Sequence, residues 1–160
     1  MIKIRRYLFS RVKADLPQKM VFITGPRQAG KTTLGLSLPQ AREGYLDWDT
    51  PEHRERFLRR DLPAADLWFL DEIHKFRSWL TYLKGFYDGR SASQRIIVAA
   101  SARLVHYGLS GDSLQGRYHL LRLHPLSSAE LGMKSASDFR QLLMLGGFPK
   151  TFSPSWRKSP

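Results

Sequence analysis

Nine consecutive residues combine the glycines, the lysine and the hydroxyl groups that a polyphosphate site requires. In order they are Gly25, Pro26, Arg27, Gln28, Ala29, Gly30, Lys31, Thr32 and Thr33. Their spacing matches G-x-x-x-x-G-K-S/T, in which glycines let successive backbone N–H groups turn toward one anion. Lys31 can then reach the outer phosphates, and the Thr32 hydroxyl can bind Mg²⁺. The run therefore predicts a loop that binds a nucleoside triphosphate.

The segments on either side of this loop fit the prediction. Residues 20–24 are an apolar run with a preference for strand, as expected of a strand that leads into the loop. Residues 31–38 can form the helix that follows, with Pro39 ending it, and its positive end would face the anion. The alternative is a strand-to-helix turn that carries a lysine by chance. The strand before the loop and the helix after it disfavour that alternative.

Two adjacent carboxylates follow a second apolar run. Residues 66–70 have the composition of a buried strand, and Asp71 and Glu72 come directly after it. At the end of such a strand Asp71 would hold the metal, directly or through water. Glu72 would orient the attacking water and take its proton. The alternative is that the pair caps the next helix, and the loop upstream favours the catalytic interpretation.

Helices and strands alternate along the chain. Strands are predicted at 20–24, 44–48, 66–70, 95–99 and 118–123, and helices at 2–14, 31–38, 52–60, 79–87 and 139–145. This order predicts an α/β fold of three layers, with a mainly parallel five-stranded sheet between helices. In such sheets ligands bind at the carboxyl ends of the strands, which is where the loop and the acidic pair would lie.

Composition limits the class of protein. A chain of 160 residues is long enough for one domain with a real core. The sequence has no cysteine, which excludes disulfides and thiolate metal sites. No apolar stretch approaches the ~20 residues of a membrane span, and the first residues lack the apolar core of a signal peptide. We therefore expect a cytoplasmic protein with no membrane partner.

Positive charge is unevenly distributed. The formal net charge is +12, and bases outnumber acids nine to one in residues 1–42 and ten to three in residues 89–160. Residues 43–88 instead hold ten acids and seven bases. A basic shell of this kind is compatible with a nucleic-acid-binding surface. Some of the bases are already assigned to phosphate binding, however, and the N-terminal cluster can equally form a solvated helix face.

Four further runs follow the loop in a specific order. They are Leu-Asp-Glu-Ile-His-Lys at 70–75, Ser-Ala-Arg-Leu at 101–104, Gly-Asp-Ser-Leu-Gln-Gly-Arg-Tyr at 111–118 and Leu-His-Pro-Leu-Ser-Ser-Ala-Glu-Leu at 123–131. With the loop, they resemble a prokaryotic AAA-superfamily P-loop ATPase, of the group in which the ATPase core precedes a C-terminal domain of unknown function. The resemblance covers roughly residues 1–150. It implies a P-loop NTPase fold with the fourth strand between the first and the third, and ATP and Mg²⁺ as cofactors.

The resemblance also implies two further roles. Ser101, at the end of the fourth strand, would sense the γ-phosphate, although a plain helix cap fits it equally well. Arg117, before the fifth strand, would act as an arginine finger on a neighbour's nucleotide, which requires a homo-oligomer. The alternative, which the sequence supports equally, is that Arg117 forms a structural ion pair with an acid such as Asp112. The chain departs from the family at Ala100, where glycine is usual.

The end of the chain departs further from the family. We expect residues 1–135 to form the nucleotide-binding domain, and residues 136–160 to hold a short helix and an unstructured tail rich in Pro, Ser and bases. The chain thus resembles a family member truncated after the ATPase core. The leading hypothesis is Mg²⁺-dependent ATP binding and hydrolysis. The alternatives are an ATP-binding switch with negligible turnover and a basic nucleic-acid-binding module.

Overall fold

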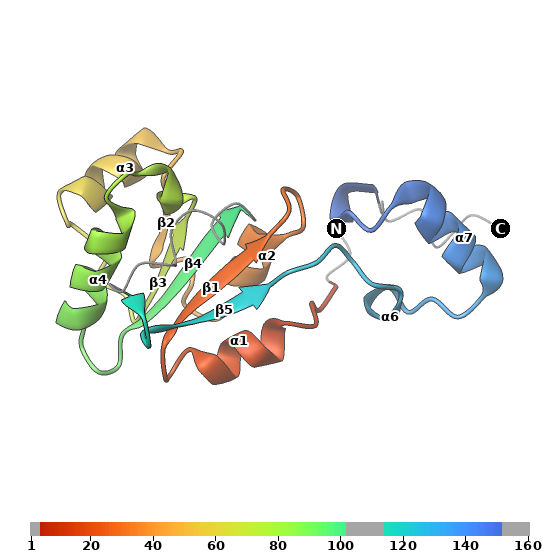
Figure 1. Cartoon of the computed structure of the whole chain (residues 1–160), viewed down its shortest axis with the longest axis horizontal. Helices are drawn as coiled ribbons and strands as arrows, with labels where there is room; N and C mark the ends of the chain where they lie inside the picture. Colours follow the sequence, from red (N-terminus) through yellow and green to blue (C-terminus); the bar gives the residue numbers. More distant parts are fainter. Residues whose placement is uncertain (1–3, 102–113, 152–160) are drawn as a thin grey trace.

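The computed structural model describes residues 4–101 and 114–151, which contain a five-stranded parallel sheet (Figure 1). The strands are β1 (Met20–Gly25), β2 (Tyr45–Asp47), β3 (Leu67–Asp71), β4 (Arg95–Ser101) and β5 (Tyr118–Arg122). Their order in the sheet is β2-β3-β4-β1-β5, and every neighbouring pair is parallel. The predicted α/β class is therefore confirmed, and β4 lies between β1 and β3 as the family resemblance implied.

Helices cover both faces of the sheet. One face packs against α1 (Phe9–Asp15) and α2 (Lys31–Leu36), and the other against α3 (Pro51–Leu58) and α4 (Trp79–Gly89). Successive residues of a strand point to opposite faces. Accordingly Val21 and Ile23 of β1 join the core on the α1 and α2 side, whereas Phe22 joins the core on the α3 and α4 side. Strands β1, β3 and β4 are largely apolar because both of their faces are buried.

Three helices are shorter than their sequence pattern predicts, and one of them, α3, ends at Leu58 instead of residue 60. The helix α1 begins at Phe9 rather than at residue 2, and residues 1–3 lie outside the described part. In the described part of this segment the side chain of Arg6 and the backbone N–H of Tyr7 both donate to Glu130, which holds them in a non-helical conformation. The helix α2 ends at Leu36 instead of Leu38, because Pro39 disfavours helical angles in the residue before it.

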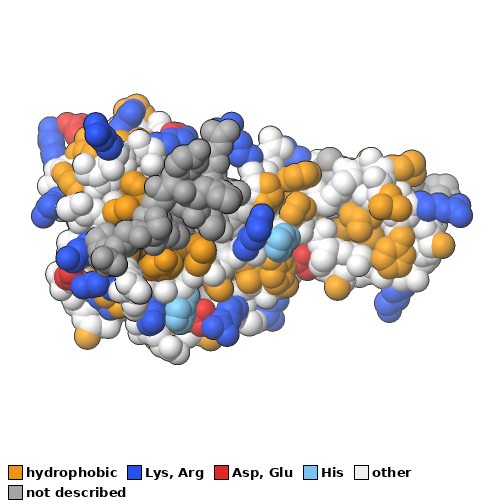
Figure 2. All heavy atoms as spheres, in the orientation of Figure 1, with side chains coloured by type: hydrophobic (Ala, Val, Ile, Leu, Met, Phe, Trp, Pro, Cys, Tyr) orange, Lys and Arg blue, Asp and Glu red, His pale blue; other side chains and the backbone are white. Residues whose placement is uncertain are grey.

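The C-terminal segment holds α6 (Ser128–Leu131), α7 (Ala136–Leu145) and a short 3-10 helix, η3 (Pro149–Thr151), and it extends away from the sheet in Figure 1. The helix α7 begins earlier than predicted because Ser135 and Asp138 form a capping box. None of its residues is buried, and Leu143 is 84% exposed. Figure 2 shows apolar side chains gathered over this part. The predicted boundary after residue 135 stays a prediction, and residues 152–160 lie outside the described part.

No helix among residues 4–101 and 114–151 is both long enough and apolar enough to cross a membrane.

Candidate nucleotide-binding site

The strand register brings the predicted site residues to one end of the sheet. Gly25, the last residue of β1, lies opposite Ser101 of β4, and Asp71 of β3 lies opposite Ala99. The backbone N–H of Glu72 donates to the carbonyl of Ala99 over 3.0 Å. Because all of these strands run in parallel, the loop, the acidic pair and Ser101 meet at the carboxyl end of the sheet, as predicted.

The loop after β1 depends on its glycines. A Cβ on Gly25 would lie 2.2 Å from the carbonyl oxygen of Leu123, which is backbone and cannot move aside cheaply. Gln28 and Gly30 adopt the left-handed conformation, with φ of 63° and 93°. Of the loop side chains, Ala29 and Lys31 are buried, Pro26 and Thr32 are half-buried, and Arg27, Gln28 and Thr33 are exposed.

Lys31 is held across the base of this loop. Its side chain is buried, and Nζ donates to the carbonyl oxygens of Gly25 and Pro26 over 3.1 and 2.9 Å. Burial lowers the pKa of Lys31, while the charges of Glu72 and Asp71 oppose that shift. A buried ammonium group whose neutral partners are two loop carbonyls can form stronger, charge-assisted hydrogen bonds with an anion.

Thr32 and Asp71, both predicted to bind the metal, are in direct contact. The Thr32 hydroxyl donates to Oδ2 of Asp71 over 2.7 Å, and the Tyr45 hydroxyl donates to the same oxygen over 3.3 Å. Asp71 is only 4% exposed. Burial raises the pKa of Asp71, and the hydrogen bond from Thr32 partly opposes the rise. Burial and the nearby Asp71 carboxylate also raise the pKa of Tyr45, which the sequence did not single out.

Glu72 follows in a strained backbone conformation. Its φ is 54°, which is uncommon for a residue other than glycine. It precedes a 3-10 helix, η1 (Ile73–Lys75), and its side chain makes no capping hydrogen bond there. Oε2 of Glu72 instead lies 3.5 Å from Nζ of Lys75 and 3.8 Å from Nε2 of His74. The carboxylate is thus turned toward cationic and imidazole groups beside the loop.

Ser101 and Arg117 occupy opposite ends of the sheet. Oγ of Ser101 lies 3.3 Å from Nε2 of His74 at the carboxyl end. Arg117 precedes β5, whose first residue pairs with Met20 at the start of β1, and so it lies at the amino end. There Nε of Arg117 donates to Asp88 over 2.9 Å. Asp112, the acid suggested as its partner, lies outside the described residues, and a role toward a neighbouring chain stays a prediction.

Arg6 is a neighbour of the loop that sequence reasoning missed. Its buried guanidinium donates to the carbonyl oxygens of Ala29 and His124, each over 2.5 Å. Nε also pairs with Glu130 over 2.8 Å, and the side chains of this ion pair are only 7% and 5% exposed. Arg6 thereby ties the loop to α6. No local pattern marks it, because its partners lie far away in the sequence.

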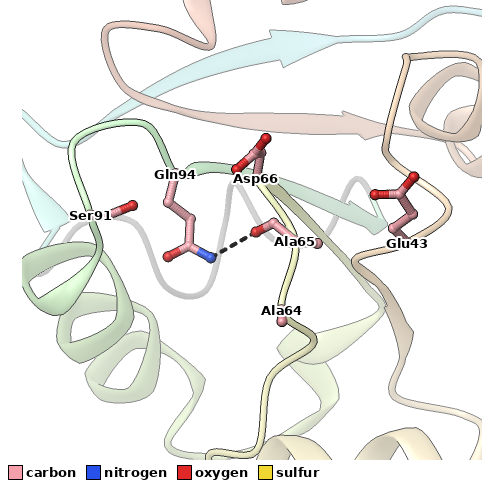
Figure 3. Close-up of a pocket in the computed structure, with 6 residues that line it drawn as sticks. All are labelled: Glu43, Ala64, Ala65, Asp66, Ser91 and Gln94. Atoms are coloured by element: carbon pink, nitrogen blue, oxygen red, sulfur yellow. Dashed lines mark hydrogen bonds between the residues drawn. The ribbon is translucent and has the colours of Figure 1, made fainter.

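A hollow of about 300 Å³ lies away from these residues (Figure 3). It is lined by Glu43, Ala64, Ala65, Asp66, Ser91 and Gln94. Glu43, Asp66 and Gln94 precede β2, β3 and β4 in the sequence, so the hollow lies at the amino end of the sheet. Its lining has two carboxylates and no base, which does not suit a polyphosphate. The candidate site is therefore the carboxyl end.

The parallel sheet, its strand order and the glycine-dependent loop after β1 define a P-loop NTPase domain. A family model described as an AAA domain matches residues 17–132, and the chain therefore belongs to the AAA domain family.

The relatives that this chain matches are longer than it is. Uncharacterized proteins from Mycobacterium bovis and Mycobacterium tuberculosis are each 32% identical to it over 165 residues, which is 96% of this chain and 37% of theirs. A solved STAND protein with a tetratricopeptide repeat sensor, from Pyrococcus horikoshii, superimposes with a TM-score of 0.58 at 14% identity. That match covers 92% of this chain and 29% of the other, and at this identity it shows the fold alone.

Proposed function

We propose that this chain binds ATP together with Mg²⁺ and hydrolyses it. The observation that carries the proposal is the 2.7 Å contact between Thr32 and Asp71, directly beneath a loop that holds a buried lysine. Among the described residues neither Lys31 nor Asp71 forms an ion pair, although both are buried. Burying a charge without an ionic partner is costly, and a strand-to-helix turn with no ligand gives no reason for that cost. A magnesium-bound polyphosphate supplies both missing partners.

Phosphate binding falls to the loop. Lys31 would exchange its bonds to the Gly25 and Pro26 carbonyls for charge-assisted bonds to the outer phosphates. The left-handed residues Gln28 and Gly30 favour the inward turn of backbone N–H groups that forms an anion nest. ATP rather than another nucleotide follows from the family.

Residues that fit Mg²⁺ are already adjacent. A hydroxyl and a carboxylate are the oxygen ligands that Mg²⁺ prefers, and Thr32 and Asp71 provide one of each. A cation would also favour the ionised form of Asp71, whose pKa is raised by burial. When bound, Mg²⁺ would neutralise charge on the phosphate oxygens.

Water activation is assigned to Glu72, whose carboxylate lies beside the loop and can accept the proton of an attacking water. Ser101 would donate a hydrogen bond to the terminal phosphate. Hydrolysis would be slow in a single chain, because Arg117 lies at the far end of the sheet and would have to come from a neighbouring copy. An arginine finger of this kind contributes roughly 10³-fold or more to turnover.

Calorimetric titration with Mg-ATP tests the proposal directly. We expect wild type to bind and Lys31→Ala to lose affinity by about 10- to 100-fold, as for lost hydrogen bonds to a charged group. Lys13→Ala, at an exposed lysine of α1, is the matched control and should bind normally. Phosphate release on the same samples should disappear in Glu72→Gln. Unchanged binding by Lys31→Ala would reject the site.

The same samples separate the two alternatives. An ATP-binding switch would bind tightly and release no phosphate from wild type. A nucleic-acid-binding module would bind DNA or RNA with a steep salt dependence that survives Lys31→Ala. In the described residues, two bases in or directly after α3 already pair with acids, Arg56 with Asp61 and Arg59 with Glu55.

A further inference from the structure

The imidazole of His74 lies between two residues that the proposed reaction uses separately. Nε2 is 3.3 Å from Oγ of Ser101 and 3.8 Å from Oε2 of Glu72. The side chain is only 17% exposed. One ring nitrogen thus faces both the residue assigned to the terminal phosphate and the residue assigned to the attacking water.

The backbone fixes His74 in this place. The left-handed turn at Glu72 directs the chain from the end of β3 toward the end of β4, and the bond from Glu72 N–H to the Ala99 carbonyl anchors the turn. Ile73 is 1% exposed and anchors η1 in the core. His74 is therefore held against Ser101 by the fold, and it does not reach Ser101 from a mobile surface position.

The ring has few other polar contacts. Its second nitrogen, Nδ1, is buried and has no hydrogen-bond partner among residues 4–101 and 114–151. Burial lowers the pKa of His74, the Glu72 carboxylate opposes this, and the charges of Lys75 and Lys31 lower it further. A neutral ring carries one N–H. If Nε2 carries it, His74 can donate to Ser101 or to Glu72, but not fully to both.

We propose that His74 is a positioning residue that moves its one N–H between Glu72 and Ser101 according to the nucleotide. This inference rests on the proposed function. When the Ser101 hydroxyl donates to a terminal phosphate, its oxygen becomes the better acceptor and holds the Nε2–H. The Glu72 carboxylate is then released to accept a hydrogen bond from water. With a diphosphate bound, the imidazole turns from Ser101 toward the Glu72 carboxylate, now 3.8 Å away, and occupies it.

Binding of ADP and of a non-hydrolysable ATP analogue, each with Mg²⁺, tests this without requiring turnover. We expect wild type to prefer the analogue by about tenfold, the value of roughly one good hydrogen bond. His74→Ala should lose this preference to within about twofold while its affinity for ADP stays unchanged. His74→Gln places an amide nitrogen near the position of Nε2 and should restore most of the preference. His124→Ala, at an exposed histidine after β5, is the matched control.

Turnover provides a second readout. His74→Ala should lower kcat by about 10- to 100-fold, because Glu72 is no longer positioned, and raise KM for ATP by about the factor by which it weakens binding of the analogue. An equal loss of ADP and analogue affinity would instead indicate a merely structural role and overturn the proposal. So would full ATP preference and turnover in His74→Ala. Absence of any binding by wild type would reject the nucleotide site itself, whereas binding without discrimination rejects only the His74 inference.

Discussion

The two ends of the sheet differ in the exposure of an arginine–carboxylate pair, which is buried at the carboxyl end and open to solvent at the amino end, although the Asp15 carboxylate is buried at the amino end as well. At the carboxyl end Lys31 and Asp71 are 7% and 4% exposed, and Arg6 pairs with Glu130 in the interior. At the amino end the side chains of Arg117 and Asp88 pair over a similar distance but are 32% and 44% exposed. Two ion pairs of the same chemistry therefore stand in different dielectric surroundings.

This difference supports the proposed ligand site at the carboxyl end of the sheet. Burying a charge costs stability unless partners compensate for it, and such costs persist mainly where a ligand uses them. Left-handed backbone alone does not mark the site, since Gln40 and Arg60 adopt it in turns after α2 and α3. At the carboxyl end the left-handed residue Glu72 lies near two buried charged residues, Lys31 and Asp71. Left-handed backbone together with buried charge is what marks the candidate site.

The largest expected effect comes from substituting one glycine at each end of the sheet. Gly25→Ala should destabilise the protein by about 4 kcal/mol, because a backbone clash and a strained φ act together, and Mg-ATP binding should be lost. Gly116 stands at the amino end with φ of 78° and nothing within 4 Å of an added Cβ. Gly116→Ala should therefore cost only about 1–2 kcal/mol. Urea denaturation measures both, and equal losses would contradict the comparison.

Removing Arg6 should have the next largest effect. Arg6→Ala leaves Glu130 and two carbonyls without their donor, and we expect a loss of about 3 kcal/mol, as for other broken buried pairs. The double variant Arg6→Met, Glu130→Gln removes both charges and should lose less than about half as much. Thermal denaturation of both variants distinguishes these outcomes. Identical losses in the single and double variants would mean that the unpaired carboxylate is not the cause.

The acid stability of the protein should depend on Glu130. Burial opposes its ionisation, but hydrogen bonds from Ser127, Arg6 and Tyr7 outweigh burial and lower the pKa of Glu130 below its usual 4.5. The stabilisation is complete above pH 4.5 and is lost as pH falls through the lower, folded pKa. Glu130→Gln should be less stable than wild type at pH 7, and this difference in the free energy of unfolding should become smaller as pH drops below 4.5. A constant difference between pH 7 and pH 3 would argue against this ionisation.

Asp71→Asn should separate stability from function. Because burial raises the pKa of Asp71, the folded state disfavours its ionised form, and wild-type stability falls as pH rises from 3.8 toward that raised pKa. At pH 7 the neutral variant should gain about 1 kcal/mol, or about 3 °C in Tm. The variant keeps Glu72, whose negative charge acts on Lys31 more strongly than that of Asp71 does. The Mg²⁺ dependence of ATP binding should vanish. A lower Tm without nucleotide would show that burial of Asp71 is not costly.

Local patterns predicted the parts of the site that are contiguous in sequence. Strand, loop and helix follow one another around Lys31, and parallel strands bring Thr32 to Asp71 by topology alone. Arg5 and Arg6 show the limit. The two are adjacent and identical in type, yet the guanidinium of Arg5 lies over Phe9 near the surface while that of Arg6 is buried against the loop. Only long-range contacts distinguish the two arginines, and a local sequence pattern does not predict such contacts.

Arg117 should give the smallest effect in a single chain and the most informative one in an assembly. Its pair with Asp88 is exposed, and exposed pairs contribute little to stability. Arg117→Ala should therefore leave the melting curve and Mg-ATP affinity unchanged at low protein concentration. If Arg117 acts on a neighbour's nucleotide, turnover per chain should rise with concentration in wild type and stay flat in Arg117→Ala. Asp88→Ala, which frees Arg117 from its partner, should preserve the rise. A flat wild-type profile, or an equal rise in Arg117→Ala, would leave the amino end with no part in hydrolysis and would confine the chemistry to the buried charges at the other end of the sheet.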